Sequence, residues 1–300
     1  MKIAVFCAFD TPATIEYAQE TVLYLEKKGH ELQLDKRLIE HISKPIIHKS
    51  FEASGTIDPK TDFLFSIGGD GTLLRSIPFV KDSKIPILGI NTGRLGFLTS
   101  LQKESLNEAL DEFFDEKFKL VERSLLSVTL SDTDHSLNNS FPFALNEISI
   151  NRKNTTSMLS IQTKIDEEYL TTYWADGLII ATPTGSTGYS LSSNGPILTP
   201  ETKGIILNPI APHNLNIRPL VVPDEATIKI SVDGRGDGHL MSLDSRIFTL
   251  ENGSSITIKK AAFPVFTIDA VIPPMPCIAS NIHLPSKFSI FLQGLQSPVP

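Results

Sequence analysis

The amino-acid sequence predicts an α/β domain with a Rossmann-like parallel sheet, followed by an all-β domain. In the first third of the chain, short apolar runs alternate with segments of helical periodicity, as in a parallel sheet covered by helices. From about residue 121, short β-branched runs recur between turns rich in Asn, Asp and Gly, which indicates antiparallel strands. The 300 residues suffice for two domains. We therefore expect an α/β domain over residues 1–120, an all-β domain over 121–265 and an atypical Pro-rich tail over 266–300.

The elements of the α/β domain follow from its apolar periodicity. A strand is expected over Ile3–Ala8. A helix is expected over Ile15–Lys28, where apolar residues recur near helical spacing and Gly29 is suited to the C-cap. The other expected elements are strands over Phe63–Ile67 and Ile85–Ile90, and helices over Leu73–Val80 and Leu106–Phe118.

The strands of the all-β domain are predicted from runs that are β-branched or alternate with polar residues. They are expected over Leu125–Leu130, Ala144–Ile150, Leu159–Ile165, Gly177–Ala181, Ala226–Val232 and Ser255–Lys260.

Composition and charge restrict the class of protein. Apolar residues make up 41% and charged residues 20%, a balance typical of a globular protein with a substantial core. The formal net charge of -7 argues against a protein that coats nucleic acid, because such a protein needs a basic surface. The longest uncharged stretch, Gly177–Pro200, is too rich in Gly, Ser, Thr and Pro for a membrane helix. We expect neither nucleic acid nor a membrane as a partner.

The cysteines and the N-terminus indicate a cytoplasmic location. Cys7 and Cys277 have no zinc-site spacing, and so few cysteines fit a reducing compartment. The chain enters a strand-like run at Ile3 without the features of a signal peptide.

The segment Gly68–Thr72, Gly-Gly-Asp-Gly-Thr, lies between an expected strand and an expected helix. Glycines allow close approach to a phosphate, and a helix N-terminus offers unpaired N–H groups and partial positive charge to it. An Asp in such a loop would repel phosphate unless it binds a metal or accepts a proton. The simpler alternative is a tight turn with a capping Asp.

Two further segments suit a nucleotide. Asp176–Ser190 runs from an apolar strand into a loop of hydroxyls and glycines with one aromatic ring at Tyr189, which fits a sugar and a purine better than a flexible linker. Asn146–Glu147 interrupts an apolar run and offers an amide and a carboxylate to a ribose or an adenine edge. By itself, this pair fits an outward-facing Glu on a half-buried strand better than a binding site.

Together these segments resemble the NAD kinase family. The glycine motif is shared with diacylglycerol kinases, whereas Thr182–Ser190 after Asp176-Gly177 is far more specific to NAD kinases. Further family-like segments are Asn91–Leu98, Ile210–His213 and Ser242–Arg246. The resemblance covers roughly residues 1–265 and implies transfer of the γ-phosphoryl group of ATP to the adenosine 2′-hydroxyl of NAD.

The resemblance also implies roles for the residues of the glycine motif. Asp70 would act as general base or help to hold the metal, and both roles remain open. Gly71 and Thr72 would contact phosphates through their backbones, and Arg75 would reach them with its guanidinium. A divalent cation, normally Mg²⁺, comes with ATP and needs no dedicated protein site. As in the family, a homodimer or homotetramer is expected.

The dinucleotide site is implied in the same way. Asn146 and Glu147 would hold the adenosine side of NAD, and Asp176 the nicotinamide side. The residues expected to line the pocket are Thr187, Gly188, Tyr189 and Ser192, with Phe97, Thr184 and Arg246 as further candidates. Trp174 is expected to pack against the protein rather than to stack on a ligand.

Two other functions remain as alternatives. A lipid kinase of the diacylglycerol type shares the glycine motif but needs an apolar or basic membrane-facing patch. A non-catalytic NAD(P) sensor would keep the pocket and lose turnover. The C-terminal tail departs from the family: it is rich in proline, which disfavours a helix over Ile272–Pro285, although Phe288–Leu295 can form a short one. We expect this tail to lower stability or activity.

Overall fold

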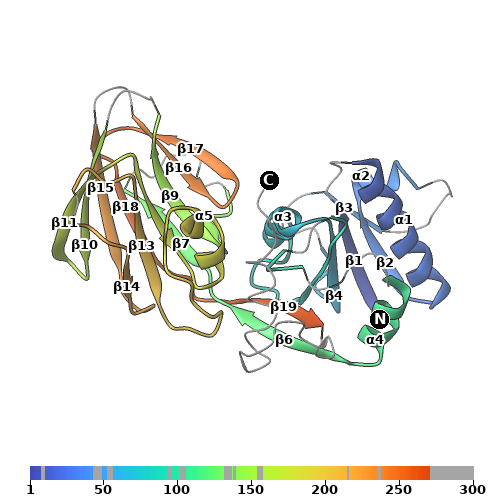
Figure 1. The fold of residues 1–300 in the computed structure, drawn as a ribbon. Coiled ribbons are helices and arrows are strands. Elements are labelled where there is room, and N and C mark those ends of the chain that lie inside the picture. Colours follow the sequence, from blue (N-terminus) through green and yellow to red (C-terminus); the bar gives the residue numbers. More distant parts are fainter. Residues whose placement is uncertain are drawn as a thin grey trace, which may run out of the picture. The chain divides into compact units, whose positions relative to one another are not determined.

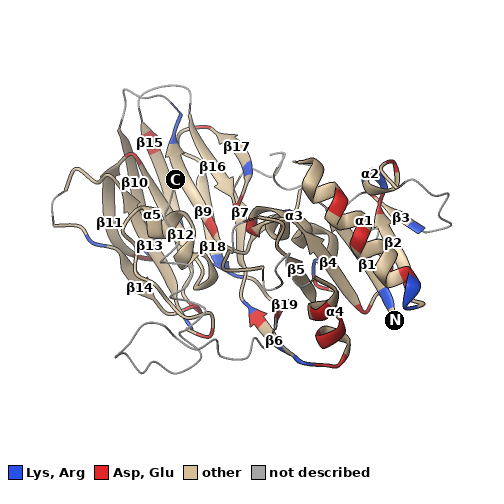
Figure 2. Cartoon of the chain, turned by 45° about the vertical axis from the view of Figure 1, so that its right-hand side comes forward, with Lys and Arg blue, Asp and Glu red and all other residues tan. Residues whose placement is uncertain are grey.

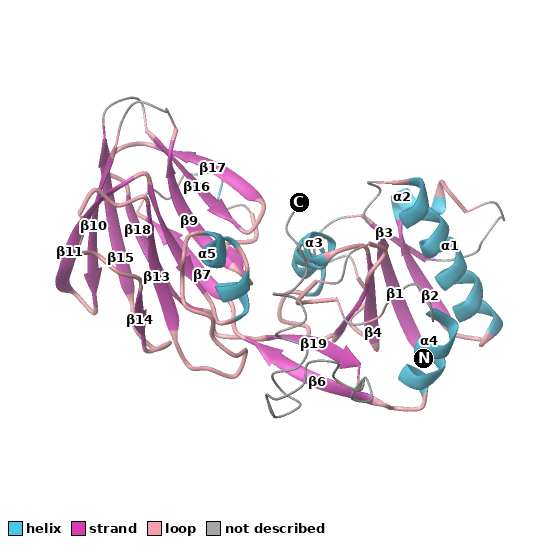
Figure 3. Ribbon diagram, in the orientation of Figure 1, coloured by secondary structure: helices cyan, strands magenta, loops and turns pink. Residues whose placement is uncertain are grey.

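The computed structural model describes residues 1–7, 11–42, 49–52, 57–93, 96–99, 101, 106–131, 137, 140–153, 158–214, 216–234 and 238–270. The chain divides into two units (Figure 1): residues 1–121 with the segment from residue 265, and residues 122–264. The first combines helices with a largely parallel sheet and the second consists mainly of antiparallel strands (Figure 3), which confirms the predicted fold class.

The α/β unit is built on a seven-stranded sheet. In spatial order its strands are β3 (Lys49–Phe51), β2 (Glu31–Asp35), β1 (Lys2–Cys7), β4 (Phe63–Ile67), β5 (Ile87–Ile90), β19 (Val265–Ala270) and β6 (Phe118–Arg123). The strands from β3 to β19 pair in parallel. The chain order reverses between β1 and β4, so the carboxyl ends of these two strands mark the place where open α/β sheets bind ligands.

Helices α1 (Pro12–Lys27), α2 (Lys36–Ile39), α3 (Asp70–Val80) and α4 (Leu106–Phe114) belong to this unit. Helix α1 begins where Thr11 accepts a hydrogen bond from Thr14 N–H at 3.2 Å, and Gly29, at φ +78°, follows its end. Its residues Val22 and Leu25 are fully buried in the same apolar cluster as strand residues of the sheet. Figure 2 shows acidic residues on both α1 and α4.

The sequence-based expectations for this unit needed several corrections, two of which concern α4 and β2. The helix expected over Leu106–Phe118 ends at Phe114, because Glu116 takes φ +60° and the chain turns into β6. Strand β2, Glu-Leu-Gln-Leu-Asp, was not expected, although its two leucines alternate with polar residues.

The all-β unit contains two six-stranded sheets. One contains, in order, β11 (Glu168–Ala175), β10 (Leu159–Ile165), β15 (Ile228–Gly234), β18 (Ser255–Lys260), β7 (Leu126–Leu130) and β8 (Phe143–Ala144). The other contains β14 (Leu220–Val222), β13 (Ile205–Ile210), β12 (Gly177–Ala181), β9 (Glu147–Arg152), β16 (His239–Leu243) and β17 (Arg246–Leu250). A 3-10 turn, η3 (Thr184–Thr187), and the short helix α5 (Tyr189–Ser192) follow β12.

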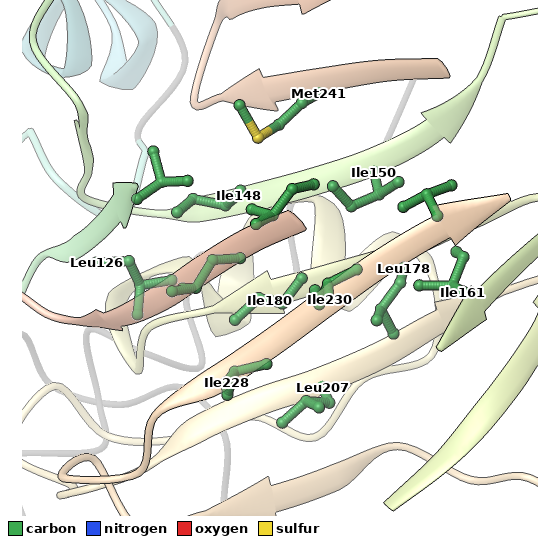
Figure 4. Packing of buried hydrophobic residues seen from close by; sticks show 14 of the residues in the cluster. Leu126, Ile148, Ile150, Ile161, Leu178, Ile180, Leu207, Ile228, Ile230 and Met241 are labelled. Carbon is green, nitrogen blue, oxygen red and sulfur yellow. The ribbon is translucent and has the colours of Figure 1, made fainter. Parts of the chain in front are cut away.

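One apolar cluster joins the two sheets of this unit (Figure 4). Ile150 and Ile180 come from one sheet, Ile161 and Ile230 from the other, and all are at most 1% exposed. Removing such side chains from water is the main stabilising contribution to a β-sandwich. The neighbouring strands β9 and β12 can therefore hold polar groups at their ends in fixed positions.

The C-terminal part of the chain returns to the α/β unit. Residues 266–270, expected to begin the tail, belong instead to β19, which pairs with β5 through Thr267 with Ile87 and Ile268 with Leu88. The rest of the expected tail, including the segments over 272–285 and 288–295, lies outside the described residues. Among the described helices, none is long and apolar enough to cross a membrane.

Candidate active site

The glycine motif forms a tight turn between β4 and α3. Gly68 has φ +148°, and a Cβ on it would lie 2.2 Å from Thr72 Oγ1, so both its conformation and its neighbour require glycine. Gly69 is the N-cap of α3, which corrects the alternative of a capping Asp. The N–H of Thr72 donates to Gly69 O at 2.8 Å, so Asp70 and Gly71 supply the first N–H groups of the helix.

The Asp70 carboxylate is held by the segment that follows β5. Its Oδ2 accepts from Phe97 N–H at 2.8 Å, and its Oδ1 accepts from the N–H groups of Leu98 and Thr99 and from Thr99 Oγ1, at 3.1 to 3.2 Å. A Cβ on Gly96 would lie 2.1 Å from Asp70 Oδ1, so only glycine permits this approach. Among the described contacts Oδ2 accepts one hydrogen bond, and an ionised carboxylate oxygen has capacity for a second. Phe97, a candidate from the sequence, thus contributes its backbone to the site.

A hydrogen-bond chain connects Asp70 with the start of α1. Asn91, which is 2% exposed, donates through Nδ2 to Thr99 Oγ1 at 3.0 Å and accepts from Gly93 N–H at 2.7 Å. The hydroxyl of the next residue, Thr92, lies 3.2 Å from that of Thr14. The segments that follow β4 and β5 are therefore coupled to each other and to the start of α1. Arg75 lies on the exposed side of α3.

In the all-β unit, the loop after β12 packs directly on Asn146. Thr182 N–H donates to Asn146 O at 2.9 Å, and Thr182 Oγ1 donates to Leu145 O at 2.5 Å. A Cβ on Gly185 would lie 2.0 Å from Asn146 O. The structure therefore brings the Asn146–Glu147 pair and the 182–189 loop together.

Glu147 is buried, with 9% of its surface exposed, so the interpretation as an outward-facing strand residue was wrong. Burial, and then the charge of Asp244, raise the pKa of Glu147 to about 7, while the N–H of Tyr189 lowers it. Its Oε2 and Asn146 Oδ1 are buried without hydrogen-bond partners among the described residues. A Cβ on Gly188 would lie 3.0 Å from Glu147 Oε2. Unpaired buried oxygens are costly, which is typical of a site that a ligand completes.

The loop is braced from several sides, which excludes a flexible linker. Ser186 Oγ donates to Pro183 O at 2.6 Å and accepts from Leu198 N–H at 3.1 Å. Asn208 Nδ2 donates to Ser190 O at 2.9 Å. Sequence reasoning missed Asn208 because it lies on another strand, and only the pairing of β12 with β13 brings it here.

The remaining candidates of this loop differ in exposure. Thr184 is 6% exposed, and its Oγ1 accepts from the buried Arg123 at 3.4 Å. Thr187 donates to Thr184 O at 3.3 Å. Tyr189 is 41% exposed, and Ser192 is exposed at the end of α5. The Tyr189 ring is therefore accessible to a ligand.

Asp176 does not lie with the other candidates of its unit. It precedes β12 and forms an ion pair with Arg152 at 2.8 Å. In the register of β12 with β9, Gly177 pairs with Asn151 and Ala181 pairs with Glu147. Asp176 is thus about 16 Å along the strand from Glu147 at the usual rise per residue. Trp174, expected to pack against the protein rather than to stack on a ligand, is 49% exposed on β11.

Arg246, the last candidate, is directed at the protein backbone. Its guanidinium donates to the carbonyl oxygens of Phe141 and Phe143 and lies 5.4 Å from the centre of the Phe141 ring. Two residues earlier, Asp244 accepts hydrogen bonds from Asn146 and its neighbours.

Both units match known protein families. The ATP-NAD kinase N-terminal domain matches residues 3–118, and the ATP-NAD kinase C-terminal domain matches residues 145–270. The NAD kinase of Christiangramia forsetii is 47% identical over 270 residues, which are 88% of this chain and 91% of that protein. The NAD kinase of Flavobacterium psychrophilum is 44% identical over 273 residues, 90% of this chain and 92% of that protein.

Two solved structures share the fold. Yeast NADH kinase complexed with NADH has a TM-score of 0.82 at 25% identity, covering 99% of this chain and 86% of that one. An NAD kinase from Archaeoglobus fulgidus in complex with ATP has a TM-score of 0.70 at 27% identity, covering 90% and 94%. These matches extend over both units, which argues against the lipid-kinase alternative.

Proposed function

This chain belongs to the NAD kinase family and is an ATP-dependent kinase, and we propose that it transfers the γ-phosphoryl group of ATP to the adenosine 2′-hydroxyl of NAD to form NADP. The observation that best supports a dinucleotide site on this chain is the pair of buried oxygens on Asn146 and Glu147, beside Gly188, that have no hydrogen-bond partner in the described part of the chain.

Asn146 and Glu147 bind the adenosine side of NAD. An amide and a protonated or ionised carboxyl together accept and donate hydrogen bonds, as a ribose diol or an adenine edge requires. Thr184, Thr187, Gly188 and Ser192 line this site. The exposed ring of Tyr189 offers a face on which a base stacks.

Asp70 acts on the 2′-hydroxyl. In the transfer, the hydroxyl oxygen bonds to the γ-phosphorus, the bond from that phosphorus to the β-phosphate oxygen breaks, and the hydroxyl loses its proton. Asp70 either accepts this proton or helps to hold the metal. The hydrogen bonds from residues 97–99 fix the direction of its carboxylate, which serves either role.

The phosphates of ATP lie at the start of α3. Gly71 and Thr72 approach them through the backbone and Arg75 through its guanidinium, where the helix end favours an anion. Across the described residues, no three His, Cys, Asp or Glu side chains gather as a metal-binding group. The divalent cation, Mg²⁺, binds with the triphosphate, because Mg²⁺ is commonly held by substrate phosphates and one or two carboxylates such as Asp70.

Asp176 holds the nicotinamide side. Its separation from Glu147 along β12 suits a ligand whose two nucleosides are joined by a pyrophosphate. The ion pair with Arg152 orients the carboxylate. We also propose a cytoplasmic location, in keeping with the few cysteines, and a homodimer or homotetramer, as the family resemblance implies.

The test is NADP formation from NAD, ATP and Mg²⁺ by the purified protein and by Asp70→Asn. This substitution keeps the shape of the side chain and removes its charge. We expect the rate to fall roughly a hundredfold or more, the usual contribution of a positioned acid or base. Asp82→Asn, an exposed Asp just after α3, is the matched control and keeps the parent rate.

The possible outcomes separate the alternatives. Loss of turnover in folded Asp70→Asn, with NAD binding retained, supports the kinase reaction and the role of Asp70. NAD binding without turnover in the parent protein would favour the non-catalytic sensor.

A further inference from the structure

The turn between β16 and β17 directs its carboxylate at three consecutive backbone amides. Asp244 Oδ2 accepts from Leu145 N–H at 3.0 Å, and Oδ1 accepts from the N–H groups of Asn146 at 2.8 Å and Glu147 at 3.3 Å. Its own N–H donates to Glu147 O at 3.0 Å. Asp244 has φ +51°, a conformation that Asp tolerates better than most residues.

These amides lie where regular strand pairing stops. Strand β8 ends at Ala144 and β9 begins at Glu147. Buried N–H groups without a partner are strongly unfavourable. The Asp244 carboxylate accepts the hydrogen bonds that a paired strand would otherwise accept from these N–H groups. Arg246 holds the preceding part of the same segment through the carbonyl oxygens of Phe141 and Phe143.

The position of this segment is critical for the loop opposite. The backbones of Gly185 and Asn146 lie so close together that Asn146 cannot shift toward the loop. A Cβ on Gly185 would lie 2.0 Å from Asn146 O. A displacement of the 145–147 backbone would therefore move the two unpartnered oxygens relative to Gly188.

We propose that Asp244 is a positioning residue for the dinucleotide site: it acts through the backbone of Leu145–Glu147 to fix where the side chains of Asn146 and Glu147 point, with Arg246 supporting the same segment. This role rests on the proposed function, because it presumes that Asn146 and Glu147 bind NAD.

The charge of Asp244 allows its role to be tested in a second way, through the pH at which Glu147 titrates. It acts with burial to raise the pKa of Glu147, and the Tyr189 N–H at the start of α5 opposes both. Burial also raises the pKa of Asp244, while the N–H groups of Leu145 and Asn146 and the charge of Arg246 lower it. Removing the charge of Asp244 therefore lowers the pH at which Glu147 titrates.

The experiment compares Asp244→Asn, Asp244→Glu and the control Asp166→Asn with the parent protein. Asp166 also has a positive φ in a hairpin turn, and its carboxylate accepts from Thr227 N–H at 2.8 Å, but among the described contacts it has none with residues 145–147. KM for NAD, kcat and the pH dependence of both are measured, and the titration of Glu147 is followed by carbon NMR of its carboxyl, assigned with Glu147→Gln.

For Asp244→Asn we expect KM for NAD to rise roughly tenfold or more, because an amide group cannot replace both acceptor oxygens. We expect kcat to change less and the titration of Glu147 to move to lower pH. Asp244→Glu keeps the charge but displaces the oxygens, so KM rises while Glu147 titrates nearer its parent pH. Asp166→Asn changes none of these quantities.

Two results would overturn the role of Asp244. One is an unchanged KM and an unchanged Glu147 titration in folded Asp244→Asn. The other is a large fall in kcat at unchanged KM, which would mean that Asp244 touches the reacting atoms. If Asp244→Asn does not fold, Asp244→Glu decides by its KM. A parent protein that forms no NADP would instead overturn the proposed function.

Discussion

Single residues at the candidate site acquire their chemistry from burial. Glu147 is adjacent to Asn146 in a sequence pattern that also fits an exposed strand position. The structure buries Glu147 beside Asp244 and next to Gly188 of the 182–189 loop. This environment raises the pKa of its carboxyl from the ordinary 4.5 to about 7. The sequence shows the residue type, but the neighbours that change its pKa come from the turn between β16 and β17 and from the start of α5.

The stability of the protein is expected to depend on pH through Glu147. Its pKa in the folded protein, about 7, lies above the ordinary value of 4.5, so the folded state holds a proton that the unfolded state has lost between these values. Its favourable contribution is complete below pH 4.5 and is lost as pH rises through 7. Because Gln does not titrate, Glu147→Gln lacks this pH-dependent contribution. We expect its free energy of unfolding, relative to that of the parent, to increase by at most about 3 kcal/mol from acid to alkaline pH.

Urea unfolding of both proteins at acid and alkaline pH measures this difference. The same free-energy difference at both pH values would show that Glu147 titrates normally in the folded protein.

At the scale of elements, the loop after β12 depends on close backbone approach. Its hydroxyl-rich sequence pointed to a binding loop, and the hydrogen bonds of Thr182 and Ser186 show how it is held. The support from Asn208 and Asp244 could not be predicted from the sequence. Asn208 lies 26 residues from Thr182 in the chain and Asp244 lies farther away, and both reach the site only through strand pairing.

Gly185→Ala tests this close approach. The new Cβ would lie 2.0 Å from Asn146 O and 2.4 Å from its carbonyl carbon, and neither backbone atom can rotate away. We expect a loss of about 1–3 kcal/mol or more in stability, the range of overpacked sites, and a raised KM for NAD.

Gly234→Ala is the matched control in the same unit. Its Cβ would meet the end of the Leu159 side chain at 3.0 Å, a group that can move. Thermal unfolding and NAD kinetics of both variants decide the comparison, and equal effects would refute the special role of Gly185.

At the scale of the whole molecule, the chain completes its first sheet last. It leaves the α/β unit through β6 and returns at β19, which lies between β5 and β6. A strand after residue 264 was not predicted, because the many prolines that follow indicated an irregular tail from residue 266. Pairing between Ile87 and Thr267 joins residues far apart in sequence, and local periodicity carries no information about such contacts.

Two truncations test the role of β19. A chain that stops after Pro264 loses β19 and leaves β5 and β6 without their common neighbour, whereas a chain that stops after Ala270 keeps it. We expect faster amide hydrogen exchange in β5 and β6 only in the shorter chain, since unpaired strands open more readily. Equal protection in the two chains would show that β19 does not stabilise this sheet.

The sequence by itself determined the succession of an α/β and an all-β part, the glycine motif at the start of a helix and the identity of the hydroxyl-rich loop. These are local properties: apolar period, turn residues and the steric freedom of glycine act over a few neighbouring residues. Only the tertiary structure decided that residues 97–99 hold Asp70, that Glu147 is buried and that Asp244 holds the backbone beside it. These contacts depend on strand pairing and burial, which bring together residues that the sequence keeps apart.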